Sequence, residues 1–129
     1  MKPRRIVVID DNVQAAETLA IILRYWGHDA YVAFDGPTGL AAVSEYRPDV
    51  VILDIELPSM SGIDVARQLR SMAEHDDTML ISLTGHDVSS LLEPSSSKLF
   101  DHALSKPLNM SALERLLVRQ RLAPQSASA

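Results

Sequence analysis

Five polar residues of this chain stand where short apolar segments end, and their types suit chemistry at a metal ion. They are Asp10, Asp11, Asp54, Thr84 and Lys106. Carboxylates that cluster repel one another, so they either change their pKa values or bind a cation. Oxygen ligands without cysteine or histidine beside them suit Mg²⁺, which takes one or two carboxylates and keeps several waters.

The threonine and the lysine add what a phosphoryl group requires. A hydroxyl donates a hydrogen bond to a phosphoryl oxygen, and an ammonium group, like a bound metal ion, offsets negative charge on those oxygens. A carboxylate can attack phosphorus and hold the group as an aspartyl-phosphate. The pattern therefore indicates a site for a phosphoryl group, with a carboxylate as candidate nucleophile.

The segments that must position these residues follow two patterns. Short, non-alternating apolar runs are typical of strands buried on both faces, and apolar residues at helical spacing indicate helices. The predicted strands span residues 6–9, 29–34, 49–53, 78–83 and 102–105. The predicted helices span residues 12–26, 35–46, 62–72 and 109–122. Gly27 is expected to end the first helix, and Asn109 is expected to cap the start of the last helix. Asp11 is a candidate cap for the start of the first helix.

Strands that alternate with helices predict a doubly wound α/β domain with a parallel sheet. In such a sheet the functional site lies beyond the carboxyl ends of the strands, where the strand order reverses. If the first and third strands are neighbours, Asp10, Asp11 and Asp54 meet at one edge of the sheet. We expect one domain over residues 1–122 and a disordered tail over residues 123–129.

The composition fits a small soluble domain and excludes several other classes of protein. The 129 residues are 47% apolar and 22% charged, which is enough for one hydrophobic core. The absence of cysteine excludes a disulfide scaffold and a thiolate metal site, and it predicts a cytoplasmic setting. The net charge of −5 argues against direct nucleic-acid binding, and the longest apolar run, residues 19–23, cannot span a membrane.

Several stretches of the sequence resemble the motif blocks of the response-regulator receiver domain of two-component signalling. They are VVIDDN, VVILDIELPSMSG, SLTG and LSKPL, in this order, and the resemblance runs from about Arg5 to Leu122. It implies a flavodoxin-like parallel sheet of five strands in the order 2-1-3-4-5. It also implies phosphorelay signalling, with a histidine kinase or a histidine phosphotransfer domain as phosphodonor. Such a domain acts on its own side chain and is not an enzyme that turns over a free metabolite.

The resemblance assigns a role to each candidate residue at the matching position. Asp54 would be the phosphoacceptor, Thr84 would bind a phosphoryl oxygen, and Lys106 would pair with the phosphoryl group. The Mg²⁺ ligands would be Asp10, Asp11, Asp54 and the backbone carbonyl of Glu56. The peptide bond between Lys106 and Pro107 would be cis, as is usual in the family.

Two features depart from the family pattern. Ala103 stands where receivers commonly carry tyrosine or phenylalanine, so no aromatic ring can move inward together with Thr84. Between Thr84 and Lys106, Pro94 and the serines at 95–97 interrupt the pattern of a regular helix. We therefore expect an irregular fourth helix, and the oligomeric state stays open because that region commonly forms the dimer face.

The sequence leaves other interpretations open. Residues 15–40 and 100–108 look more like receivers attached to hybrid sensor histidine kinases than like those of transcription factors. A pseudo-receiver, which binds proteins without being phosphorylated, would share the fold, although the complete set of polar residues argues against it. A haloacid-dehalogenase-type phosphatase would need a second aspartate where Glu56 stands.

The remaining polar residues have simpler interpretations. The histidines are too scattered for a metal site, so surface positions are predicted for them. They are His28, His75, His86 and His102. Arg67 and Arg70 are predicted to lie on a solvated helix face.

Overall fold

Five parallel strands form the centre of the fold, in the order β2-β1-β3-β4-β5. This computed structural model describes residues 3–58, 60–72, 77–85 and 98–118. The strands are β1 (Arg5–Ile9), β2 (Asp29–Ala33), β3 (Val50–Asp54), β4 (Met79–Thr84) and β5 (His102–Ser105). The order confirms the predicted doubly wound sheet, and it reverses between β1 and β3, where a site is expected.

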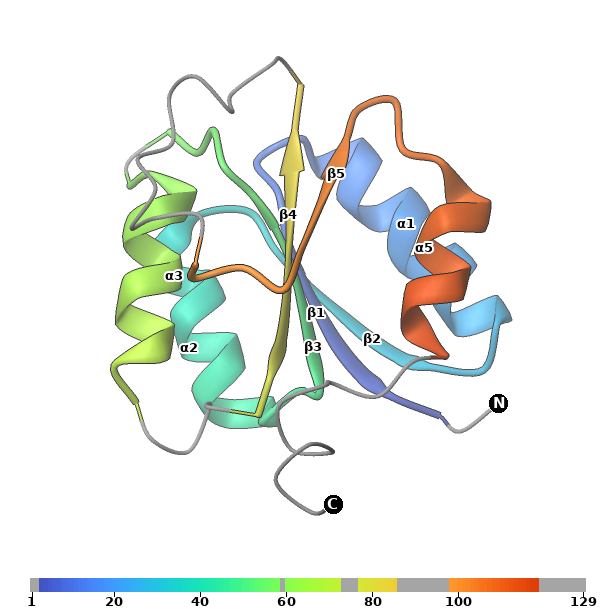
Figure 1. Cartoon of the computed structure of the whole chain (residues 1–129), viewed down its shortest axis with the longest axis horizontal. Coiled ribbons are helices and arrows are strands. Elements are labelled where there is room, and N and C mark those ends of the chain that lie inside the picture. Colours follow the sequence, from blue (N-terminus) through green and yellow to red (C-terminus); the bar gives the residue numbers. More distant parts are fainter. Residues whose placement is uncertain (1–2, 59, 73–76, 86–97, 119–129) are drawn as a thin grey trace.

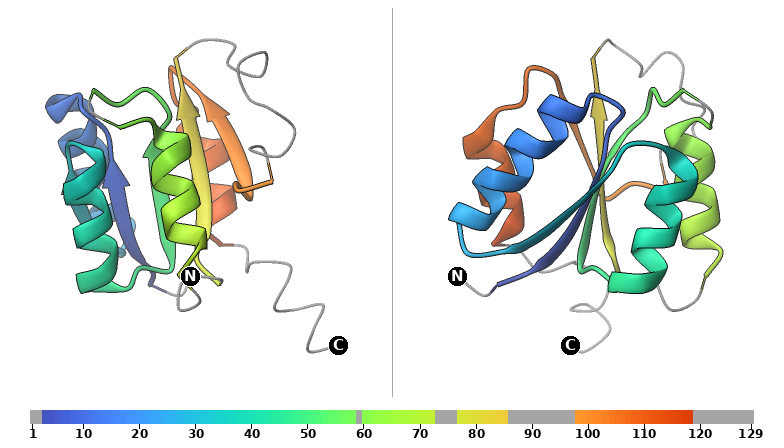
Figure 2. Two further views of the ribbon diagram at one scale, coloured as in Figure 1. Left: turned by 90° about the vertical axis from the view of Figure 1, so that its left-hand side faces the viewer. Right: turned by 180° about the vertical axis from the view of Figure 1, so that it is seen from behind.

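Helices cover both faces of this sheet (Figure 1). They are α1 (Val13–Tyr25), α2 (Gly36–Tyr46), α3 (Gly62–Arg70) and α5 (Met110–Leu117). Helices α1 and α5 lie on one face and α2 and α3 on the other, as the view from behind in Figure 2 also shows. Within the described ranges, no helix has both the length and the apolar character needed to cross a membrane. The predicted irregular fourth helix, Pro94 included, and the predicted tail lie outside the described residues.

Two hydrophobic clusters, one on each face, join the sheet to its helices. Ile6 and Val8 of β1 point into the cluster beneath α1 and α5, and Val7 and Ile9 point into the cluster beneath α2 and α3. All of these side chains are fully buried, which explains why the strand sequences do not alternate. Burying a side chain of this size contributes about 1.5–3 kcal/mol, so the central strands are rigid supports for the residues at their ends.

The caps of α1 and α5 come from asparagine. The Asn12 side chain accepts a hydrogen bond from the first turn of α1, so the Asp11 cap was predicted wrongly: Asn12 fills that position. Asn109 caps α5 as predicted. Gly27 has φ of +97°, the left-handed conformation that ends a helix, which confirms its predicted role.

Two predictions of surface exposure are wrong. His28 is buried, and its Nδ1 atom accepts a hydrogen bond from the backbone N–H of Arg4 at 3.0 Å. The side chain of Arg70 is only 15% exposed and donates to backbone carbonyls of neighbouring segments. Arg67 is exposed as predicted and pairs with Asp64 at 3.7 Å. Of the other histidines, His102 is partly exposed, and His75 and His86 lie outside the described residues.

Candidate phosphoryl-group site

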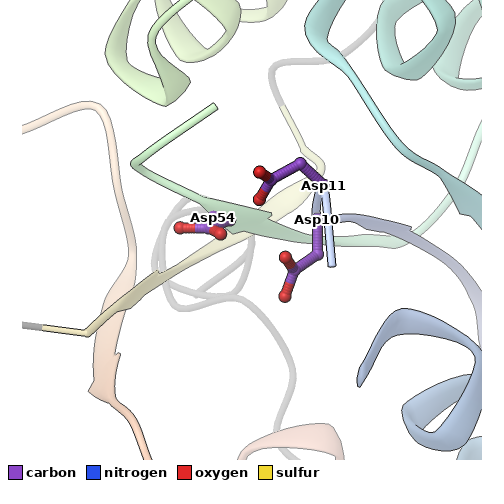
Figure 3. Close-up of side chains that lie close together, drawn as sticks. All are labelled: Asp10, Asp11 and Asp54. Atoms are coloured by element: carbon purple, nitrogen blue, oxygen red, sulfur yellow. The ribbon is translucent and has the colours of Figure 1, made fainter. Parts of the chain in front are cut away.

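Three carboxylates gather beyond the carboxyl ends of β1 and β3 (Figure 3). Asp10 and Asp11 directly follow β1, and Asp54 is the last residue of β3. Because Ile9 pairs with Leu53 in the parallel ladder, the residues that follow them emerge side by side. Each of the three acids offers a carboxylate oxygen, and these oxygens all lie within 4.8 Å of one another. The prediction that these three acids lie together at one edge of the sheet is therefore confirmed.

Backbone N–H groups hold the two buried members of this cluster. Asp54 accepts a hydrogen bond at Oδ1 from the N–H of Glu56 at 3.0 Å, and Asp10 accepts one at Oδ1 from the N–H of Asn12 at 2.9 Å. Asp10 and Asp54 are buried, whereas Asp11 is exposed. The arrangement fixes one oxygen of each buried carboxylate and leaves the other oxygen directed to the centre of the site.

Lys106 reaches both of those remaining oxygens. Its Nζ atom lies 3.2 Å from Asp54 Oδ2 and 3.3 Å from Asp10 Oδ2. Its own backbone N–H donates to the carbonyl of Thr84 at 2.7 Å, which continues the pairing of β5 with β4 by one residue. The peptide bond between Lys106 and Pro107 is cis, as predicted.

The remaining candidates, Thr84 and Glu56, stand beside this group. Thr84 is the last residue of β4 and is 8% exposed, in register with Ser105 of β5. Glu56 has an exposed side chain, and it contacts the site through the backbone N–H that holds Asp54. The chain therefore brings the five polar residues to one edge of the sheet.

Burial and the Lys106 ammonium group act in opposite directions on the pKa of the Asp54 carboxyl group. Burial raises the pKa of Asp54 above its ordinary value, and the charge of Asp10 adds to the rise. The Glu56 N–H and the Lys106 ammonium oppose that rise without cancelling it. Burial would lower the pKa of Lys106, but its hydrogen bonds and attraction to Asp54 and Asp10 outweigh burial and raise that pKa.

These residues fit a divalent cation. Three carboxylates face a single ammonium group, so the cluster carries excess negative charge. All of the side-chain ligands are oxygens, the donor type that Mg²⁺ prefers, and the exposed Asp11 leaves one side open for metal-bound water. Among the described residues, Lys106 is the cation that pairs with this donor set, and a divalent cation would offset the remaining negative charge.

A groove of about 490 Å³ begins at the site and runs between α1 and the segment that follows β5. Asp10 and Lys106 line the end of the groove at the acid cluster. Most of the rest is lined by the apolar residues Ala15, Leu19, Ile22, Leu83, Pro107, Leu108 and Met110, and the polar residues Asn12, Gln14 and Thr18 also line it. The groove therefore offers a largely apolar surface next to the candidate nucleophile.

Sequence reasoning missed this groove, although the sequence held a signal for it. Ala15, Leu19 and Ile22 are four and three residues apart, so they form a stripe along one side of α1. Leu19 belongs both to this stripe and to the stripe that faces the core. Because the two stripes share a residue, the sequence shows them as one apolar face.

Comparisons with known proteins agree with this geometry. The family model of the response regulator receiver domain matches residues 6–118 of this chain. The DNA-binding response regulator MtrA of Mycobacterium tuberculosis (strain ATCC 25618 / H37Rv) is 48% identical over 81 residues, which cover 63% of this chain and 36% of that protein. The response regulator MprA of Mycobacterium sp. (strain KMS) is 38% identical over 119 residues, which cover 92% of this chain and 50% of that protein.

Solved structures show the same fold. A CheY-like receiver domain from Methylobacillus flagellatus has a TM-score of 0.81 at 28% identity, covering 90% of this chain and 97% of that one. NtrX from Brucella abortus, in complex with ATP, has a TM-score of 0.81 at 25% identity, covering 98% of this chain and 29% of that one. The chain spans half or less of the length of the curated relatives described above. Its attachment to a hybrid kinase stays a prediction.

Proposed function

The chain belongs to the response regulator receiver domain family of two-component signalling, and on this premise we propose that Asp54 accepts a phosphoryl group in the presence of Mg²⁺. The phosphodonor is a histidine kinase or a histidine phosphotransfer domain. One observation carries the proposal: Asp54 stands within 4.8 Å of two further acids and 3.2 Å from the ammonium group of Lys106. An acid that only capped a helix would need none of these neighbours.

The residues that would hold Mg²⁺ are Asp10, Asp11, Asp54 and the backbone carbonyl of Glu56. When bound, the ion offsets the negative charge of the phosphoryl oxygens and of the acids that surround them. The fit rests on the excess of carboxylates over ammonium groups at the site. Asp10 is held in place by the N–H of Asn12, so its oxygen is oriented before any ion arrives.

The transfer step uses one carboxylate oxygen of Asp54 as the nucleophile. That oxygen attacks the phosphorus of a phosphohistidine, an O–P bond forms, and the N–P bond breaks with its electron pair going to the imidazole. Lys106 then balances the charge on the phosphoryl oxygens, and the hydroxyl of Thr84 donates a hydrogen bond to one of them. Later hydrolysis by water releases inorganic phosphate and returns the free Asp54 carboxylate. The domain acts on its own side chain and turns over no free metabolite.

The groove beside the site is the docking surface for the phosphodonor. Its apolar walls, including Leu19 and Ile22 on one side and Leu108 on the other, fit the apolar face of a helix. Asp10 and Lys106 line its end, so a helix seated there places its histidine beside Asp54. A partner helix that carries a phosphohistidine meets both conditions.

The setting and the partners follow from the same proposal. We expect a cytoplasmic domain without direct contact to nucleic acid, in keeping with its net charge of −5. The curated relatives are longer than this chain, and one of them is named as DNA-binding, so any output is expected to reside outside these residues.

The test is phosphorylation by a small phosphodonor. We expect acetyl phosphate with Mg²⁺ to add one phosphoryl group to the wild type, seen by intact-mass spectrometry, and none to Asp54→Ala. Asp64→Ala, which removes an exposed acid of α3, is the matched control and should be modified normally. Beryllofluoride with Mg²⁺ should shift NMR signals around Asp54. A wild type that responds to neither reagent is a pseudo-receiver.

A further inference from the structure

Arg70 joins three segments of the chain at the end of the sheet opposite to the acid cluster. It is the last residue of α3, and its guanidinium donates to the carbonyl of Thr78 at 2.7 Å and to the carbonyl of Leu99 at 3.1 Å. It also forms an ion pair with Asp101 at 2.9 Å. The planar guanidinium supplies all of these donors at once, which a lysine ammonium cannot match in geometry.

Asp101 carries the contact onward to the backbone of β4. Its Oδ2 atom accepts the N–H of Leu80 at 2.8 Å, and its own N–H donates to the carbonyl of Leu80 at 2.8 Å. These bonds add a rung to the ladder just before β5 begins at His102. At the other end of the strand, the N–H of Lys106 donates to the carbonyl of Thr84. The pairing of β5 is therefore fixed at both ends.

Between these two anchors the strand is held by its backbone pairing with β4 and by the partial packing of Leu104 against the core. Among the strands described, β5 alone has no buried residue, and its residues alternate between partly exposed and exposed. It lies at the edge of the sheet, where it pairs only with β4 (Figure 2, left). Hydrophobic burial specifies the register of a strand only where one face is buried, so burial alone specifies β5 poorly.

We infer that Arg70 and Asp101 are positioning residues for Lys106, which they serve by fixing the place of β5 along β4. Lys106 directly follows β5, so any sliding of the strand moves its ammonium group away from Asp54 and Asp10. A shift by a single residue displaces the chain by about 3.3 Å, which is enough to break both contacts. This inference rests on the proposed function, because it assigns the pair a part in phosphorylation of Asp54.

The pair is partly shielded from solvent, in contrast to a second arginine of the same helix. The side chains of Arg70 and Asp101 are 15% and 21% exposed, whereas those of Arg67 and Asp64 are 53% and 55% exposed. Removing one partner of an exposed pair costs little stability, whereas removing one partner of a shielded pair costs more because the other charge stays buried without compensation. Arg67→Ala is therefore the matched control for Arg70→Ala.

The test is a double-mutant cycle on the rate of Asp54 phosphorylation by acetyl phosphate, at a temperature where every variant is folded. We expect Arg70→Ala to slow the reaction by about tenfold through misplacement of Lys106. In a Lys106→Met background the same substitution should have no further effect, because the group that it positions is gone. Arg70→Lys should recover part of the rate, and Arg67→Ala should leave it unchanged.

A second readout does not depend on phosphorylation. Amide hydrogen exchange followed by NMR should show faster exchange of the Leu80 and Lys106 N–H groups in Arg70→Ala, with the N–H groups of β1 and β3 unchanged. Asp101→Asn, which keeps an acceptor for Leu80, is the milder variant if Arg70→Ala does not fold. Unchanged exchange at Lys106, or an equal slowing of phosphorylation in the Lys106→Met background, overturns the inference. A wild type that takes no phosphoryl group overturns the proposed function, and the exchange data still decide the positioning.

Discussion

The Nζ atom of Lys106 lies between two buried carboxylates, 3.2 Å from Asp54 Oδ2 and 3.3 Å from Asp10 Oδ2. The contact joins residues that are 52 and 96 positions apart in the chain. Each of these carboxylates loses hydration on burial, and the single backbone N–H that each accepts offsets only part of that loss. Lys106 therefore offsets the repulsion between the carboxylates of Asp10 and Asp54, and it does so before any metal or phosphoryl group binds.

Lys106→Met removes this ammonium group and keeps most of the side-chain volume. We expect a loss of about 1–2 kcal/mol in the free energy of unfolding without Mg²⁺, because the lysine is partly exposed and solvent weakens the pair. Phosphorylation of Asp54 by acetyl phosphate should slow by roughly 10–100-fold. Urea unfolding and intact-mass kinetics measure the two effects. Lys98→Met, at an exposed position, is the control, and equal behaviour of both variants would contradict the role of Lys106.

The sequence revealed the acid cluster because its members follow strands that are easy to recognise. Buried parallel strands are short runs of apolar residues, and the residue after each run must emerge at the same edge of the sheet. Asp10, Asp54 and Lys106 could therefore be grouped from the order of the strands and the residues that follow them. The position of Ala103 could also be placed from the sequence, because it lies in β5, three residues before Lys106. It pairs with Ser82 of β4 and carries no aromatic ring.

Contacts made by long side chains could not be predicted in this way. Arg70 and Asp101 are 31 residues apart, and nothing in their local sequence distinguishes the shielded Arg70 from the exposed Arg67. His28 is similar, since a polar residue after a helix is usually solvated and its burial depends on the Arg4 backbone beside it. The cap of α1 was misassigned because aspartate and asparagine cap helices about equally well.

Asp54→Asn should stabilise the protein in buffer without Mg²⁺ at neutral pH. The pKa of Asp54 is raised by burial, so the folded state holds its proton at a higher pH than the unfolded state does. The folded state is therefore penalised as the pH rises from 3.8 through the raised pKa, and the variant escapes that penalty. We expect a gain of about 0.5–2 kcal/mol at neutral pH and little gain in acid.

Thermal unfolding over a pH series measures this gain. Mg²⁺ should narrow the difference in stability between the wild type and Asp54→Asn. A bound cation stabilises the folded wild type, and the variant binds the cation more weakly because it lacks the Asp54 carboxylate. A variant that is less stable than the wild type at neutral pH, without Mg²⁺, would show that burial of the ionised Asp54 carboxylate does not destabilise the folded state.

His28→Asn tests the buried histidine at the other end of the sheet. Burial lowers the pKa of His28 below its ordinary value of 6.5, and the charge of Arg4 lowers it further. The unfolded state then takes up a proton before the folded state does, so stability is lost as the pH falls through 6.5 toward the lowered pKa. Asparagine keeps an acceptor for the Arg4 N–H but does not titrate.

As the pH falls below 6.5, we therefore expect the free energy of unfolding of the wild type to decline more steeply than that of His28→Asn. The difference should reach a few tenths to about 1 kcal/mol and then level off. Urea midpoints measured in parallel give it directly, because all other groups titrate in both proteins. Curves that stay parallel down to acid pH would mean that the imidazole takes up its proton without cost in the folded state.

Gly62→Ala tests how closely α3 approaches the backbone of the acceptor residue. A Cβ atom at Gly62 would lie only 2.3 Å from the carbonyl oxygen of Asp54 and 2.6 Å from the Cα of Ile55, so backbone must move to admit it. The Gly62 N–H also donates to the carbonyl of Ile55 at 2.8 Å, which ties the start of α3 to the end of β3.

We expect Gly62→Ala to cost about 1–3 kcal/mol in the free energy of unfolding, the usual cost of overpacking. Because the displaced backbone belongs to Asp54, phosphorylation should slow as well, even where the variant remains folded. Gly85→Ala is the control for stability, since a Cβ atom there meets nothing within 4 Å. Urea unfolding and intact-mass kinetics with acetyl phosphate measure both effects. If Gly62→Ala were as stable and as reactive as the wild type, α3 would have room to move away from the acceptor, and the close packing would not position Asp54.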